Sequence, residues 1–285
     1  MIGSGPFTAP RRRSRALPAL AAAALLAMFA PGVARADSSQ STNWAGYAIH
    51  RGGVHFRQVV AAWTQPTVKC VPGPPTYSSM WVGIGGYSES SQALEQIGTE
   101  ADCGSSGREL SSAWYEMVPA DSNAISLHVA PGDGIRATVT VFGHNATLTL
   151  ADLTTGRSFS RTVHSSLIDT TSAEWIVEAP SLCSGNSCQT LPLADFGSTG
   201  FAFAGATSSS GQSGPIQFPA WNTTSISMFA SGRRLGGSGP QRASVSAVPT
   251  APSYGASLFG VRFNGGPATA VVSDIAHIPT DRLVH

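Results

Sequence analysis

Lysine is almost absent from this sequence, and charged residues of both signs are scarce. Lys69 is the only lysine, and Asp, Glu, Lys and Arg together make up 12% of the 285 residues. Nucleic-acid binding requires a basic face, so the composition argues against that class of protein. A chain with few titrating groups accumulates little self-repulsion in acid, which favours an acidic working environment. A codon bias toward Arg, Ala and Gly explains the same composition equally well.

The sequence also lacks the short motifs of several common hydrolases. It contains no Asp-Thr-Gly or Asp-Ser-Gly of an aspartic peptidase, no Gly-x-Ser-x-Gly elbow and no His-Glu-x-x-His zinc site. The seven histidines are scattered, and His128 and His144, for example, have no neighbouring ligand at metal spacing. We therefore expect neither a metal nor an organic cofactor.

Long apolar runs are confined to the N-terminus. Four arginines between residues 11 and 15 precede an apolar stretch over residues 16–29, and Ala34-Arg35-Ala36 follows it. This pattern predicts a secretory signal peptide over residues 1–36, cleaved near Ala36 and too short to span a membrane. Arg15 stands where a twin-arginine signal needs an apolar residue, so the ordinary export route is favoured.

Cleavage at this point would leave about 249 residues, which suits one large β domain or two small ones. We expect a single domain over residues 37–285. The leader carries five arginines, so the mature chain has about 12 basic residues against 16 acidic ones, a net charge of about −4. We expect this chain to be secreted, soluble, monomeric and free of any membrane.

Only four cysteines are present, and in an exported chain they are more typical of disulfides than of metal ligands. Cys183 and Cys188 enclose a four-residue, hairpin-like loop, so we expect them to pair. Cys70 and Cys103 then pair by elimination.

Short β-branched and aromatic runs recur along the chain between Gly- and Pro-rich turns. No convincing amphipathic helix interrupts them, which predicts an all-β, antiparallel β-sandwich of two packed sheets. Beyond Gly205 the loops become long and rich in Ser, Gly and Pro, and we interpret the strands there as closing the same sandwich, with a separate small module as the alternative. We expect short alternating strands over residues 43–66, including a run at 59–63, and one or two strands over residues 191–203. The other expected strands cover residues 80–84, 93–99, 110–118, 135–142, 146–152, 158–164, 173–178, 225–230, 243–248, 258–263 and 268–273.

Two short runs carry the candidate chemistry, Leu94-Glu95-Gln96-Ile97-Gly98-Thr99 and Ala173-Glu174-Trp175-Ile176-Val177-Glu178. Side chains alternate along a strand, so Glu174, Ile176 and Glu178 share one face of the second run. A carboxylate on an otherwise buriable strand is costly unless it is paired, hydrogen-bonded or used.

These runs and several others resemble, in the same order along the chain, the glutamic peptidases (eqolisins, family G1). The resemblance covers roughly residues 41–203 and implies a secreted, bacterial-type member with a concanavalin- or lectin-like jelly-roll sandwich. It also implies an acid endopeptidase that acts on polypeptide substrates. The further matching blocks are Asn43-Trp44-Ala45-Gly46, Trp81-Val82-Gly83-Ile84, Ala113-Trp114-Tyr115-Glu116 and Leu153-Thr154-Thr155-Gly156.

By this resemblance Glu178 is the general base that activates water, and the Gln96 amide stabilises the oxyanion. Trp81, Glu116 and Trp114 match positions that line the family's cleft, where they would hold substrate. The family also has a disulfide just after the glutamate strand, which supports the pairing of Cys183 with Cys188.

Three other residues compete for the catalytic roles. Glu174 shares the face of Glu178, Glu95 should face away from Gln96, and Gln65 is followed by a proline that marks a strand end. The chain also departs from the family where Gly85 and Ser112 replace frequent aspartates, which affects the expected pH optimum and subsite preference. The rival function is a non-catalytic carbohydrate- or peptide-binding β-sandwich.

Overall fold

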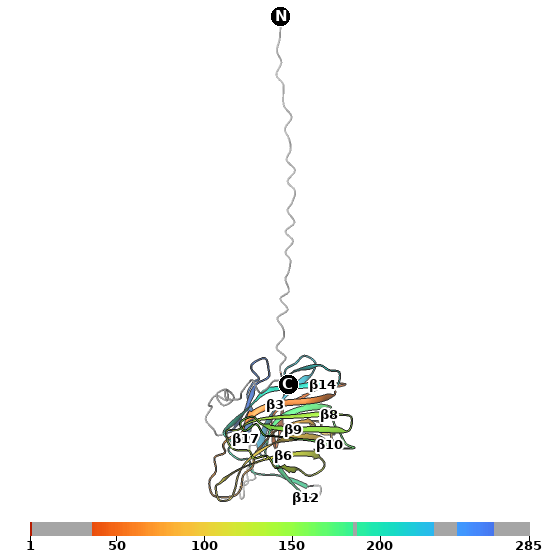
Figure 1. Cartoon of the computed structure of the whole chain (residues 1–285). Coiled ribbons are helices and arrows are strands. Elements are labelled where there is room, and N and C mark those ends of the chain that lie inside the picture. Colours follow the sequence, from red (N-terminus) through yellow and green to blue (C-terminus); the bar gives the residue numbers. More distant parts are fainter. Residues whose placement is uncertain (2–35, 185–186, 231–243, 265–285) are drawn as a thin grey trace. The chain divides into compact units, whose positions relative to one another are not determined.

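The computed structural model describes Met1 and residues 36–184, 187–230 and 244–264 (Figure 1). The body of the predicted signal peptide, residues 2–35, and the predicted strand at 268–273 lie outside these described residues. The described chain is all-β, with eighteen strands and no helix, as the alternation of the sequence predicted. No helix that could cross a membrane therefore occurs among the described residues.

Most of the expected strands occur, with ends that differ by a few residues, whereas β1, β7, β12, β13 and β15 were not expected. In chain order they are β1 (Asp37–Ser41), β2 (Trp44–His50), β3 (Phe56–Thr64), β4 (Ser79–Gly85), β5 (Leu94–Cys103), β6 (Glu109–Val118), β7 (Asn123–Ile125), β8 (Gly134–Phe142), β9 (Asn145–Asp152), β10 (Ser158–His164), β11 (Ser172–Glu178), β12 (Ser181–Ser184), β13 (Ser187–Thr190), β14 (Ser198–Ser208), β15 (Ser213–Pro215), β16 (Asn222–Ala230), β17 (Ser244–Pro249) and β18 (Phe259–Phe263).

One long sheet folds over itself to make the two layers of a sandwich. Its hydrogen-bonded order is β10-β9-β8-β3-β14-β18-β17-β16-β2-β11-β4-β5-β6-β7, and Figure 1 shows β3, β8, β9 and β10 stacked along one side. Strands far apart in this order meet across the core. Trp175 Nε1 on β11 donates to Val60 O on β3 over 2.9 Å, and Trp63 Nε1 on β3 donates to Thr99 Oγ1 on β5 over 3.1 Å.

Alternation explains which residues fill the space between the layers. On β8, Ile135, Ala137, Val139 and Val141 are buried, while the residues between them are partly exposed. Each large apolar side chain buried in this way contributes about 1.5–3 kcal/mol relative to an exposed one. The inward faces of the other strands add the largest fully buried side chains, among them Trp63, Trp175, Phe56, Phe201 and Phe259.

The C-terminal strands have an interior place in the sheet. The segment β18-β17-β16 lies between β14 and β2 and so connects one layer to the other. The expected strand at 191–203 starts later than predicted, at Ser198. The residues before it form a loop in which Ala194 and Phe196 are buried and Gly197 adopts a positive φ of 62°, so apolar burial there comes from the loop.

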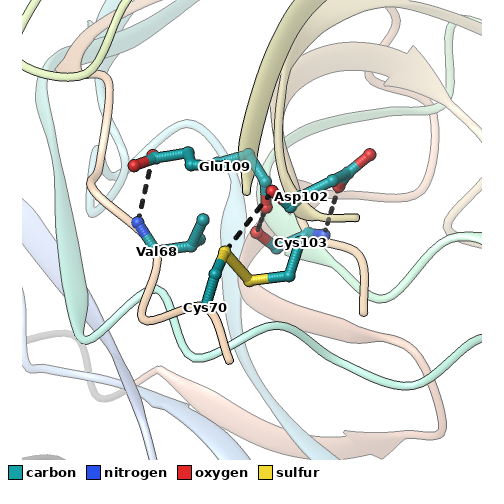
Figure 2. The surroundings of a disulfide bond; sticks show 7 residues. Val68, Cys70, Asp102, Cys103 and Glu109 are labelled. Carbon is teal, nitrogen blue, oxygen red and sulfur yellow. Dashed lines mark hydrogen bonds between the residues drawn. A yellow bond between two sulfur atoms is a disulfide. The ribbon is translucent and has the colours of Figure 1, made fainter. Parts of the chain in front are cut away.

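The predicted bridge between Cys70 and Cys103 is present (Figure 2). It fastens the Pro- and Gly-rich loop before β4 to the end of β5, and Glu109 Oε1 beside it accepts a hydrogen bond from the backbone N–H of Val68 over 3.1 Å. Cys183 lies opposite Cys188 in the β12–β13 hairpin. The Cys183 side chain lies outside the described residues, so this second pairing stays a prediction.

Candidate active site

The two candidate runs lie on neighbouring strands of one layer, in the local order β2-β11-β4-β5-β6. In this register Glu178 pairs with Trp44 on β2 and Ser79 on β4, and Gln96 pairs with Gly83 on β4 and Glu116 on β6. Directly paired residues of a sheet share a face. Gln96, Glu116, Glu174 and Glu178 therefore occupy the same face of this layer, opposite the face that carries Trp175 and the main core.

Glu178 is the last residue of β11 and is partly exposed. Its Oε2 accepts a hydrogen bond from Trp81 Nε1 over 2.8 Å, and its Oε1 accepts one from Asn43 Nδ2 over 2.9 Å. Burial raises the pKa of Glu178 to about 7, with a further upward contribution from the charge of Glu116, against the lowering effect of the Trp81, Trp44 and Asn43 donors. This carboxyl group is thus a base that titrates well above the ordinary range of glutamate.

Gln96 lies in the middle of the same face and is 4% exposed. Its Nε2 donates to Glu116 Oε2 over 2.6 Å, while its Oε1 is buried without a hydrogen-bond partner. Burial raises the pKa of Glu116, although the bond from Gln96 opposes this. Glu116 thus connects the two candidate residues: it binds the Gln96 amide, and its charge acts on Glu178.

An apolar cluster forms the floor between these polar groups. Trp81 is fully buried and packs edge to face against Trp44, with ring centroids 5.1 Å apart. Its observed polar contact is the bond to Glu178, so a direct contact with substrate stays a proposal. The members of the cluster are Ala48, Trp81, Leu94, Trp114, Ile176 and Ile226, with Trp44, Tyr87 and Val118 packed against it.

The competing residues have different surroundings. Glu174 is 0% exposed, and neither of its carboxyl oxygens has a hydrogen-bond partner. Glu95 pairs with Ile84, on the face opposite Gln96, as the alternation of the strand predicted. Gln65 is a satisfied structural residue, since it donates to Glu100 O over 2.7 Å and accepts a hydrogen bond from Thr99 Oγ1.

The two departures from the family pattern have local explanations. Gly85 has a φ of +86°, and a Cβ atom there would lie 2.6 Å from the carbonyl oxygen of Asp169. An aspartate therefore does not fit this backbone. Ser112 Oγ donates to Glu100 Oε2 over 2.6 Å, so a hydroxyl group binds an existing carboxylate where a second carboxylate would repel it.

Sequence reasoning missed one residue of the site, Asn43. It belonged to a matching block but was assigned no role, and its contact with Glu178 joins residues 135 positions apart in the chain. The matching block Asn43-Trp44-Ala45-Gly46 was the available signal for this residue. Within the described residues no group of three or more His, Cys, Asp or Glu side chains is placed to hold a metal ion.

Comparison with known proteins identifies the class. The Peptidase A4 family profile matches residues 42–231. Aspergillopepsin-2 of Aspergillus niger is 32% identical over 203 residues, which cover 63% of this chain and 69% of the relative. The chain therefore belongs to the Peptidase A4 family, the glutamic peptidases predicted from its motifs, and it is a peptide hydrolase.

Solved structures with the same fold include two peptidases with bound ligands. Scytalido-glutamic peptidase with a transition state analog inhibitor superposes with a TM-score of 0.63 at 23% identity, over 78% of this chain and 98% of that one. SCP-B, a member of the Eqolisin family in complex with the tripeptide Ala-Ile-His, gives a TM-score of 0.60 at 22% identity over the same shares. These likenesses confirm the predicted β-sandwich.

Proposed function

We propose that this glutamic peptidase is a secreted endopeptidase in which Glu178 is the general base and Gln96 stabilises the oxyanion. The observation that supports it best is the pair of carboxyl groups on β11. Glu178 is partly exposed and held by two donors, whereas Glu174 is sealed from water. A base must reach the water that it activates, so the accessible carboxylate takes this role.

The reaction then needs only groups on this face of the layer. Glu178 removes a proton from a water molecule, whose oxygen attacks the carbonyl carbon of the peptide bond. Gln96 donates one amide hydrogen to Glu116, which leaves the second to bind the negative charge on the carbonyl oxygen. Glu178 finally transfers the proton to the leaving amine, and the C–N bond breaks to give a carboxylic acid and a free amine.

Substrate side chains would rest on the apolar floor described above. Trp44 is partly exposed, and Trp114 is close to fully buried with an indole N–H that has no partner. We assign Trp114 and Trp44 to substrate contact. Trp81 would hold the Glu178 carboxylate in place, and Glu116 would hold the Gln96 amide. Trp81 and Glu116 thus belong to the predicted site, but we propose that each positions a catalytic side chain instead of contacting the substrate.

Two sets of carboxyl groups limit the pH range of activity, because one must be ionised and the other must stay protonated. Catalysis needs Glu178 ionised, and the raised pKa of Glu178 moves the acid limb above the ordinary range of glutamate. The fold favours protonated Glu95 and Glu174, because burial raises the pKa of both. These shifts therefore place the optimum close to neutrality, above the acidic range that the resemblance to the family implies.

Hydrolysis of denatured casein by the mature chain, with and without pepstatin and across pH 3 to 9, tests this function. We expect internal cleavage that pepstatin does not inhibit, with an optimum close to neutrality. Absence of cleavage throughout the series, or an alkaline optimum, would contradict the proposal. Export is tested separately by N-terminal sequencing of the secreted protein, which should begin at Asp37; the disulfide between Cys70 and Cys103 is consistent with an oxidising compartment.

A further inference from the structure

Both oxygens of the Glu178 carboxylate accept hydrogen bonds from neutral donors. Asn43 Nδ2 contacts Oε1 and Trp81 Nε1 contacts Oε2. The described strands around Glu178 place no lysine or arginine on this face, as the register of β2, β11, β4, β5 and β6 shows. The charge of the base is therefore stabilised by these donors without an ion pair.

The Asn43 amide is oriented by a second residue, Ser41, at the end of β1. Ser41 Oγ donates to Asn43 Oδ1 over 3.1 Å and accepts hydrogen bonds from the backbone N–H groups of Asn43 and Trp44. With its oxygen bound in this way, the amide presents its NH₂ group to Glu178. A flipped amide would instead direct an oxygen at the carboxylate, which is repulsive.

The backbone of Asn43 makes a separate contact with the same strand end. Its carbonyl oxygen accepts a hydrogen bond from the N–H of Ala179, the residue after Glu178, over 2.8 Å. This bond does not use the side chain. A substitution of Asn43 therefore removes the donor to Glu178 while the attachment of β11 to this turn is kept.

We propose that Asn43 is a positioning residue that keeps Glu178 ionised and aimed at the attacking water, and that it thereby sets the lower pH limit of catalysis. The inference rests on the proposed role of Glu178 as the base. A donor to a carboxylate favours the ionised form over the protonated form, which donates a proton of its own. Loss of the donor should therefore move the acid limb of the reaction to higher pH.

One other titratable group on this face acts on the pKa of Glu178 in the opposite direction. Glu116 on β6 lies on the same face of the layer as Glu178, and its charge disfavours a second negative charge. Glu100 on β5, Glu174 on β11 and His50 at the far end of β2 occupy the same face. Beside Glu178 itself, β2 and β4 present Trp44, Trp81 and small or hydroxyl-bearing residues. Among the side chains that contact Glu178, Asn43 is the one whose orientation depends on a single hydroxyl group.

The test is the pH dependence of kcat/KM for the mature chain on one internally quenched peptide chosen from its casein digest. Asn43→Ala should raise the midpoint of the acid limb by about one pH unit, which is about a tenfold loss of rate on the acid side and little loss above the limb. Ser41→Ala should give a smaller shift in the same direction. Asn123→Ala is the matched control, because that exposed asparagine donates only to Asp121 O, and its acid limb should coincide with that of the native enzyme.

The outcomes separate this inference from the proposed function. Coincident acid limbs for Asn43→Ala and the native chain would overturn the inference, as would an equal loss of rate at every pH, which indicates a structural role only. If Glu178→Gln hydrolysed the peptide in the same assay, Glu178 would not be the general base. That result would refute the proposed function independently of the Asn43 result. If Asn43→Ala does not fold, the Ser41→Ala profile decides, and an unshifted limb there refutes the positioning role.

Discussion

Glu174 and Glu178 are the same residue type on the same face of the same strand, yet their surroundings are opposite. Glu178 lies at the strand end, partly exposed, with a donor on each oxygen. Glu174 is sealed from water. Burial raises its pKa well above the ordinary value, the Ser172 hydroxyl acts against this, and the charges of Asp169 and Glu95 add to it. Access to water and the supply of donors, rather than residue type, separate the proposed base Glu178 from Glu174.

The largest effect on turnover should come from replacing each of the two glutamates by glutamine in a separate variant. Glu178→Gln keeps the shape but removes the base, so we expect turnover to fall by at least about 1,000-fold with the fold intact. Glu174→Gln should retain most activity, because a sealed carboxyl cannot reach the attacking water. Steady-state kinetics on one peptide measures both, and an active Glu178 variant beside an inactive Glu174 variant would reverse the assignment.

The next largest effect concerns the partner amide. Gln96→Ala removes the proposed oxyanion donor, and loss of one such donor typically lowers turnover by about 100- to 1,000-fold. The loss should appear in kcat far more than in KM, because the oxyanion forms only during the reaction. Glu116→Gln tests the positioning of that amide and should lower kcat less than Gln96→Ala does. Near-native kcat for Gln96→Ala would remove this residue from the mechanism.

The third prediction concerns stability against pH. The folded-state pKa of Glu95 is raised to about 8, and that of Glu174 is raised well above its usual value, both chiefly by burial. The unfolded chain therefore ionises first as the pH rises, and the stability present below about pH 4 is lost as the pH passes the raised pKa values. Thermal unfolding at pH 4 and pH 8 should show this loss in the native chain and a smaller one in Glu95→Gln or Glu174→Gln.

Variants whose loss of stability matches that of the native chain would show that these two carboxyls do not limit the alkaline range. Equal stability of native and variant chains at pH 4 is the internal control. At that pH each glutamate is protonated in the fold, and glutamine resembles the protonated acid in shape.

The smallest expected effect on turnover comes from a substitution outside the candidate active site. Replacing both Cys70 and Cys103 by serine releases a loop spanning 33 positions and should lower the free energy of unfolding by about 2 to 4 kcal/mol, measured by urea titration. Turnover at low temperature should stay near that of the native chain.

Non-reducing peptide mapping of the native protein should also show Cys183 joined to Cys188, and a link from Cys70 to either of these two cysteines would refute the pairing.

Much of the fold was predictable because its information is local. Alternation within runs such as 135–142 and 146–152 identifies β8 and β9 almost to the residue, since a strand that covers a core must direct every second side chain inward. The same alternation placed Glu174 and Glu178 on one face and Glu95 away from Gln96. The late start of β14 escaped prediction because buried loop residues such as Phe196 produce the same apolar signal as a strand.

The choice of catalytic residues among the candidate carboxyls and amides depends on contacts between residues that are distant in the sequence. The sequence by itself determined most of the strands, the set of competing carboxyls and amides and the family to which the chain belongs. Only the tertiary structure decided that Asn43 and Trp81 bind Glu178, that Glu116 binds Gln96 and that Glu174 is sealed from water. These contacts join residues up to 135 positions apart, and the order in which the strands pair across the sheet decides which side chains meet. A pKa responds to the water, donors and charges within a few ångströms, so it is a property of that assembled neighbourhood.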